Sequence, residues 1–172
     1  AGPPRLILWL GSNVGNFMRP DAIHFLQRLR AAMRPADQLL AGIDLRKDPA
    51  TLVAAYDDAA GVTAAFNRNI LVRINRELGG HFDVDQFQHE ARWNESEGRI
   101  EMHLVSAIDQ SVLIDDLNLI VSFAAGESIH TENSYKYSLH EIQLLASAAG
   151  FTADGQWFDS AERFSVNLWQ PA

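Results

Sequence analysis

The sequence predicts an α/β fold in which a strand-helix-strand unit is followed by a helical and antiparallel insertion. Two short apolar runs, Leu6–Leu10 and Leu39–Ile43, are typical of strands buried on both faces of a parallel sheet. After Asp44, two helical patterns follow one another before alternating strand patterns begin, which interrupts the βαβ rhythm. The 172 residues are long enough for one ordinary domain with a sizeable core.

Four amphipathic patterns predict helices with defined ends. Pro20 begins the first helix and Asp48-Pro49 begins the second. Gly79-Gly80 ends the third helix, and Ser138 caps the fourth. The expected ranges are 20–33, 48–59, 62–78 and 138–149.

Alternating apolar and polar residues predict antiparallel strands in the second half of the chain. Ile100–Leu104 and Leu119–Phe123 alternate in this way, and residues 156–158 and 164–169 resemble a closing antiparallel pair. The chain is therefore divided into a βαβ part at 1–47, an insertion at 48–137 and a return to the first sheet at 138–172.

Charge and composition exclude several classes of function. The net charge of −8 would repel nucleic acid over most of the surface, and the absence of cysteine excludes disulfides, thiolate metal sites and cysteine nucleophiles. No stretch approaches the roughly 20 apolar residues needed to span a membrane. We see no secretory signal, so the expected location is the cytoplasm. The start at Ala1, without methionine, indicates a cut chain.

The loop Gly11-Ser12-Asn13-Val14-Gly15-Asn16 is the first candidate for a binding site. It follows a buried strand, and open α/β sheets bind ligands at the carboxyl ends of their strands. The loop lacks the Gly-Lys-Ser/Thr ending of a P-loop, and Ser12 directly follows Gly11, unlike the serine of a G-x-S-x-G nucleophile elbow. The alternative is a polar turn without a ligand.

A second candidate is an extended segment with polar residues at alternate positions: Ser128, His130, Glu132 and Ser134. A carboxylate and a hydroxyl two residues apart could hold both nitrogens of a heteroaromatic ring, whereas a solvated strand face is the simpler alternative. His130 and Glu132, with His103, could instead bind a metal, but no compact histidine motif is present, so no metal site is expected.

Tyr56 and Met102 are expected to lie in or at the edge of the core when they are judged from the residues alone. Tyr56 shares a helix face with Leu52, and Met102 lies on an alternating strand.

In their order along the chain, several short segments together resemble the C-terminal portion of the S-adenosylmethionine-dependent histidine Nα-methyltransferases of ergothioneine biosynthesis. The resemblance runs from end to end. The segments are Gly11–Phe17, Asp44–Pro49, Ala55–Asp58, Gly61–Asn69, Gly98–Leu104 and Ser134–Ser138.

The resemblance implies a Rossmann-like class I methyltransferase sheet, of which residues 1–47 and 138–172 form the C-terminal half, with a substrate-binding domain inserted at 48–137. It also implies trimethylation of the α-amine of L-histidine to hercynine. In similar proteins the residues matching Asn16 and Tyr56 hold the substrate carboxylate, and the backbone at Gly11 lies near the α-amine.

The other implied site residues concern the substrate ring. The residues matching Glu132 and Ser134 bind the imidazole, and the residue matching Met102 packs against it. Positioning of the amine against an already activated methyl group would supply most of the catalysis, so no nucleophile is expected.

The sequence departs from the family pattern at two points. Asn13 replaces the usual threonine or serine, and the glycine-rich turn and acidic residue that hold S-adenosylmethionine have no counterpart. The chain alone is therefore not expected to bind the methyl donor. The strand at Leu6–Leu10 would be left with an unpaired edge, which is expected to pair with a separate N-terminal chain or with a second copy.

Two other functions remain open. The chain could be a binding module that holds an amino acid without transferring a methyl group. It could also belong to an enzyme that methylates a tryptophan derivative, as relatives in the same superfamily do. Glu132 and Ser134 argue against the second function, because an indole offers a carboxylate only one N–H.

Overall fold

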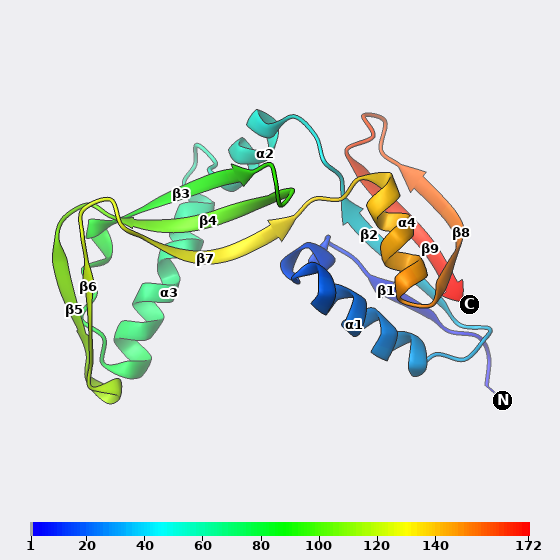
Figure 1. Ribbon diagram of the computed structural model, residues 1–172, viewed down its shortest axis with the longest axis horizontal. Coiled ribbons are helices and arrows are strands. Elements are labelled where there is room, and N and C mark those ends of the chain that lie inside the picture. The colour runs from blue at the N-terminus through cyan, green and yellow to red at the C-terminus, as the bar shows by residue number, and fades with distance from the viewer. Residues whose placement is uncertain (1) are drawn as a thin grey trace. The chain divides into compact units, whose positions relative to one another are not determined.

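The computed structural model describes residues 2–172, which form four α-helices, nine strands and three short 3₁₀ turns (Figure 1). The helices are α1 (Arg19–Ala31), α2 (Pro49–Tyr56), α3 (Val62–Leu78) and α4 (Leu139–Ala148). The strands are β1 (Leu6–Trp9), β2 (Gln38–Asp44), β3 (Phe87–Asn94), β4 (Arg99–Ser106), β5 (Gln110–Ile114), β6 (Leu119–Phe123), β7 (Ser128–Tyr135), β8 (Phe151–Phe158) and β9 (Phe164–Pro171). Ala1, where the sequence suggested a cut, lies outside the described residues.

The chain divides into two compact units. Unit 1 combines the segment that ends at Lys47 with Glu95–Arg99 and Asn133–Ala172, and unit 2 combines Asp48–Asn94 with Ile100–Glu132. The predicted insertion at 48–137 begins at the same residue as unit 2 but also includes two short segments that group with unit 1. Its assignment as a substrate-binding domain stays a prediction.

Unit 1 is built on a four-stranded sheet in the order β1-β2-β9-β8. Strands β1 and β2 are parallel and are joined through α1, which gives the expected βαβ unit. Strands β9 and β8 complete the sheet as antiparallel neighbours, with a bulge between Ala153 and Gly155. The return of the chain after α4 therefore places the last strand in the interior of the sheet.

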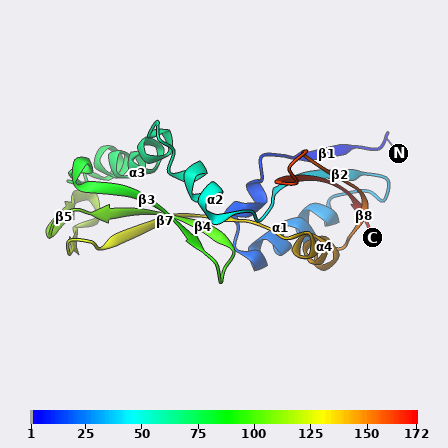
Figure 2. The same ribbon diagram turned by 90° about the horizontal axis from the view of Figure 1, so that it is seen from above.

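Helices α1 and α4 cover one face of this sheet (Figure 2). Leu26 of α1 and Ile142 of α4 are buried in one cluster with alternate residues of β2 and with Trp169 of β9. Ser138 begins α4 with a capping box: its hydroxyl accepts from the Glu141 N–H, and the Glu141 carboxylate accepts from the Ser138 N–H.

The opposite face of the sheet carries no helix of unit 1 among the described residues. Leu6 and Leu8 are 56% and 58% exposed on this face, so the expectation that β1 is buried on both faces was wrong. Ile7 and Trp9, which alternate with them, pack against the core on the covered face. Burial of β1 is therefore one-sided because helices are present on one side only.

Unit 2 contains a three-stranded sheet in the order β3-β4-β7 and a two-stranded ribbon of β5 and β6. Helices α2 and α3 both pack on β3. Leu52 of α2 packs with Ala91 and Ile100, and Leu71 of α3 packs with Phe87 and other residues of a second apolar cluster. Because Phe87 and Ala91 are four residues apart on one strand, both helices cover the same face.

Two local features differ from the sequence prediction. Helix α2 ends at Tyr56 instead of continuing to residue 59, because the Asp58 carboxylate caps α3 by accepting from the Val62 and Thr63 N–H groups. Strands β3 and β5 were not predicted, since β3 is mostly polar with weak alternation and β5 ends in a run of only three apolar residues. Within residues 2–172, no helix combines the length and apolarity needed to cross a membrane.

Candidate functional site

The loop after β1 is held in a tight left-handed turn. Gly11 and Ser12 have φ values of 74° and 55°, which is a strained conformation for a serine. The Ser12 N–H donates to the Gly42 carbonyl at 3.1 Å, and its hydroxyl accepts from the Asp44 N–H at 2.9 Å. These bonds fix the loop at the carboxyl ends of β1 and β2, where the sequence predicted a binding loop.

A 3₁₀ turn at Asn13–Asn16, which the sequence did not predict, follows directly. A Cβ atom on Gly15 would lie 2.7 Å from the Tyr135 carbonyl oxygen and 3.6 Å from the Ser134 hydroxyl oxygen, so only glycine permits this approach. Asn16 follows on the exposed side of the turn. Within unit 1, the Gly11 to Asn16 loop thus adjoins Ser134.

Ser134 contacts a buried lysine. The Nζ of Lys136 donates to the Ser134 hydroxyl oxygen at 3.0 Å and lies 2.8 Å from Oδ2 of Asp44. The Nζ of Lys47 donates to Oδ1 of the same aspartate at 2.5 Å. The carboxylate of Asp44 therefore pairs with two lysines, one of which also fixes Ser134. Lysine is rarely buried, so composition gave no signal for this contact.

Tyr56 in unit 2 is held through its backbone. The Nε2 of His89 bonds to the Tyr56 carbonyl oxygen at 2.7 Å, and the Nδ2 of Asn67 bonds to Nδ1 of His89 at 2.9 Å. Asn67 is buried and also donates to the His103 carbonyl. Because Asn67 Nδ2 can only donate, His89 accepts at Nδ1 and donates at Nε2. Sequence reasoning missed both Asn67 and His89.

Met102 is buried in the unit 2 cluster that also contains Leu52, Ala91 and Ile100. Tyr56 packs against this cluster from its edge. The sequence assigned both residues to the core by default, and the packing confirms that assignment. Their implied contacts with a substrate stay predictions.

Glu132 lines a hollow of about 250 Å³ between α3 and β7. Phe66 and Ile70 of α3 line it too, and Phe66 is 67% exposed although it belongs to the apolar stripe of the helix. Burial raises the pKa of the Glu132 carboxyl above its ordinary value. A partly desolvated carboxylate beside exposed apolar side chains is suited to accept a hydrogen bond from an N–H of a planar ring.

Three potential metal ligands also come together in unit 2. One donor atom each from Glu101, His103 and His130 lies within 4.8 Å of the others. The two imidazole rings stack, with 4.8 Å between centroids and 17° between planes. A metal ion lies close to the plane of each imidazole that binds it, and one ion cannot lie in two stacked planes. His103 instead hydrogen-bonds to Ser128 and Glu101, and burial lowers the pKa of its ring.

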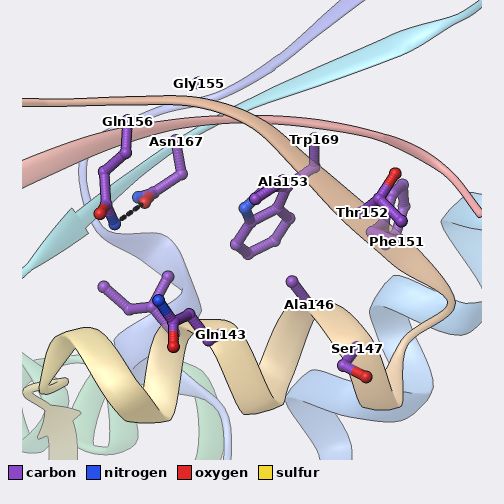
Figure 3. Close-up of a pocket in the computed structure, with 11 residues that line it drawn as sticks. Gln143, Ala146, Ser147, Phe151, Thr152, Ala153, Gly155, Gln156, Asn167 and Trp169 are labelled. Atoms are coloured by element: carbon purple, nitrogen blue, oxygen red, sulfur yellow. Dashed lines mark hydrogen bonds between the residues drawn. The ribbon is translucent and has the colours of Figure 1, made fainter.

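A larger hollow of about 390 Å³ lies between α4 and the strands β8 and β9 of unit 1 (Figure 3). Trp169 forms part of its wall, and the Gln156 side chain donates to the Asn167 side chain at 2.6 Å, so these two polar groups bond to each other. None of the predicted site residues lines it.

The six predicted substrate residues fall into two groups. Gly11, Asn16 and Ser134 belong to unit 1, and Tyr56, Met102 and Glu132 belong to unit 2. Glu132 and Ser134 nevertheless lie two residues apart on one strand, β7, as the sequence predicted.

The fold belongs to a known class of enzymes. A solved S-adenosylmethionine-dependent methyltransferase from Clostridium acetobutylicum superposes with a TM-score of 0.51 at 10% identity, over 97% of this chain and 58% of that one. The predicted fold class, the Rossmann-like fold of class I methyltransferases with an added α+β part, is therefore confirmed.

The sequence narrows this class to a family. Residues 1–171 match the family of histidine-specific, SAM-dependent methyltransferases, and the chain belongs to it. Its relatives include the histidine N-alpha-methyltransferases of Mycobacterium tuberculosis, 48% identical over 97% of this chain, and of Mycolicibacterium smegmatis, 46% identical over 95%. The chain spans about half the length of these relatives, 52% and 51% respectively.

Proposed function

We propose that the full-length protein transfers methyl groups from S-adenosylmethionine to the α-amine of L-histidine and carries the reaction to the trimethylated betaine, hercynine. The observation that carries this proposal is the 48% identity, over nearly the whole chain, to a relative named for that activity. In each round the amine would first lose a proton, and the neutral nitrogen would then take the methyl group in line as the bond from the methyl to the donor's sulfur breaks.

Glu132 and Ser134 recognise the imidazole ring in this proposal. The Glu132 carboxylate accepts from one ring nitrogen, and the Ser134 hydroxyl bonds to the other. The supporting observations are their alternate positions on β7, the hollow beside Glu132 and the burial of Ser134. An indole lacks the second ring nitrogen, which favours histidine over tryptophan derivatives.

The remaining residues orient the amino-acid portion of the substrate. Asn16 and Tyr56 hold the carboxylate, the backbone of Gly11 lies near the amine, and Met102 packs against the ring. The left-handed turn at Gly11 and the bonded carbonyl of Tyr56 support this assignment, because each fixes a local backbone conformation. A preorganised backbone reduces the entropy lost on binding.

The methyl donor supplies an electrophile that is already activated by its positive sulfur. The sequence contains no Gly-x-Gly turn, which in such folds approaches the donor, so the residues present do not fit the methionine and ribose of the donor. No residue of this chain is assigned to that role.

The bare face and free edge of β1 are proposed to bind a further strand and its covering helices. Among residues 2–172, β1 pairs with β2 only, and Leu6 and Leu8 are exposed. An apolar edge with unpaired amides favours association. The partner is an N-terminal half of the fold, supplied by another chain or chain segment, or a second copy. Light scattering tests this: a stable monomer of the 172-residue chain at micromolar concentration contradicts it.

The activity is tested by incubating the full-length protein with S-adenosylmethionine and either L-histidine or a prenylated tryptophan. Mass spectrometry is expected to show histidine with three added methyl groups. Glu132→Ala is expected to weaken histidine binding about tenfold or more, because a charge-assisted hydrogen bond is lost. Turnover of the tryptophan derivative with none of histidine would contradict the proposal.

A further inference from the structure

The hollow between α4 and the strands β8 and β9 is lined, within the described part of the chain, by uncharged residues only. Its volume of about 390 Å³ lies in the range of small-molecule sites. Ile142 and Ala146 of α4 and Phe151 of β8 supply apolar surface, and all the lining residues belong to unit 1. A charged ligand would lose its water here without gaining an ionic partner. The hollow is therefore suited to an uncharged ligand.

Trp169 supplies a hydrogen-bond donor to this hollow. The residue is 1% exposed, and its indole ring lies between the sheet and α4 (Figure 3). The N–H of a buried tryptophan usually has a hydrogen-bond partner, because an unmet donor costs free energy. Within residues 2–172, the Trp169 N–H donates to no side chain and to no backbone carbonyl. The hollow is the space that remains for an acceptor.

Gln156 supplies the complementary acceptor. The Ala41 carbonyl can only accept, so the Asn167 atom that bonds to it at 3.3 Å is Nδ2. The Oδ1 of Asn167 then accepts from the Nε2 of Gln156 at 2.6 Å. This bond orients the glutamine amide. Its Oε1 accepts from no group among residues 2–172 and is left for a donor.

A β-bulge in β8 brings Gln156 into this wall. Ala153 lies opposite Trp169, and a regular antiparallel strand would then place Gly155 opposite Asn167. The extra residue of the bulge shifts the register by one, so Gln156 lies opposite Asn167 instead. Bulges often reorient a side chain beside a functional site. The acceptor of the hollow therefore depends on an irregularity of the strand.

We propose that this hollow binds an uncharged carboxamide attached to a heteroaromatic ring. The amide oxygen accepts from the Trp169 N–H, the amide N–H donates to Oε1 of Gln156, and the ring packs on the apolar side chains of the wall. A carboxylate in place of the amide would bring an oxygen against the Gln156 oxygen and bury a charge without a cation. The inference does not rest on the proposed function, because none of the proposed substrate residues lines the hollow.

The first test follows the indole N–H signals of the full-length protein by proton–nitrogen NMR during titration with nicotinamide. Trp169→Phe identifies the Trp169 signal by its loss, and if that variant does not fold, Overhauser contacts with the Phe151 ring identify it, since the two rings are 6.0 Å apart. The Trp169 signal is expected to shift and saturate. Nicotinate, which has the same ring with a carboxylate, should bind about tenfold more weakly or less well still.

Three results of this titration would overturn the inference. A Trp169 signal that does not move with nicotinamide would mean that water alone fills the hollow. Equal binding of nicotinate would show that the hollow does not select an uncharged amide. Competition by saturating L-histidine or S-adenosylmethionine would place the nicotinamide in the proposed substrate site or with the methyl donor. Failure of histidine methylation would leave the inference standing, because the Trp169 signal reports on the hollow itself.

The second test removes the acceptor. Gln156→Leu is expected to weaken nicotinamide binding about tenfold, because the amide N–H loses its partner. Gln170→Leu is the matched control, since Gln170 is an exposed glutamine of β9 that does not line the hollow, and it should bind nicotinamide like wild type. Wild-type affinity in a folded Gln156→Leu variant, or an equal loss in both variants, overturns the inference. If Gln156→Leu does not fold, the comparison of nicotinamide with nicotinate on the wild-type protein decides.

Discussion

The two faces of the sheet in unit 1 are built from the same strands but differ in burial. On the face covered by α1 and α4, Leu39 and Ile43 are fully buried, whereas Leu6 and Leu8 on the other face are more than half exposed. Leu8 lies in register with Leu40, and Leu40 with Leu168, so the exposed face carries a row of leucines. Residue type therefore does not decide burial here; the presence of a covering layer does.

This difference is informative about assembly. Soluble proteins rarely leave a continuous apolar sheet face exposed, and such a face together with an unpaired strand edge is typical of a binding surface. The covered face is predicted to determine the stability of the chain, and the bare face is predicted to determine its association. The following predictions test that division.

The largest loss of stability is expected on the covered face. Leu26 of α1 is completely buried in the core cluster. Leu26→Ala is expected to lower the free energy of unfolding by about 2–5 kcal/mol, because it leaves a cavity that the packed sheet cannot close. Urea denaturation measures the free energy of unfolding. A smaller loss than that caused by an alanine substitution at a leucine of the exposed face would contradict the prediction that the covered face determines stability.

A pH-dependent loss is expected where α1 joins the sheet. Hydrogen bonds from Arg5 and Arg34 hold the pKa of the Asp37 carboxyl well below its ordinary value of 3.8. A depressed pKa stabilises the folded state above pH 3.8, and this contribution is lost as the pH falls below that value. Asp37→Asn should be less stable than wild type at pH 7, and the gap should narrow in acid denaturation. A gap independent of pH would contradict this reading.

A smaller effect is expected at the start of α4. Ser138→Ala removes the hydroxyl that caps the helix and is expected to cost about 1 kcal/mol of unfolding free energy. Ser138→Asp keeps a capping acceptor and should remain near wild type in thermal unfolding. An equal loss in both variants would show that the cap does not stabilise the covering helix.

The smallest change in stability is expected on the bare face. Leu8→Lys should alter the free energy of unfolding by no more than about 0.5 kcal/mol but should reduce self-association in light scattering. Ile7→Lys, one residue earlier and packed against the core, is the matched control and should destabilise the chain strongly. Equal destabilisation by the two variants would contradict the one-sided burial of β1.

The sequence predicted the elements whose signals are local. The βαβ unit and the cap at Ser138 follow from short apolar runs and capping residues, and both are confirmed. The 3₁₀ turn at Asn13–Asn16 could not be predicted, since its conformation depends on the approach of Gly15 to Tyr135, which is distant in the sequence.

In the candidate site, too, the sequence predicted what depends on local spacing and missed what depends on contacts between distant residues. The alternate spacing of Glu132 and Ser134 was visible in the sequence and falls on one strand. The contact of Lys136 with Ser134 was not visible, because lysine is normally exposed and its burial depends on Asp44 from β2. Local patterns thus predicted candidate binding residues, but not the contacts that residues distant in the sequence make with them.

The position of β9 inside the sheet determines the order in which the two units can fold during synthesis. The Asn167 side chain bonds to the Ala41 carbonyl across 126 residues, so β2 waits for its antiparallel neighbour until nearly all of this segment has left the ribosome. Unit 2, which lies between these strands in the sequence, is complete much earlier. Pairing over such a distance is slow, and we expect unit 2 to be structured while β1 and β2 still expose both faces to chaperones and to neighbouring chains.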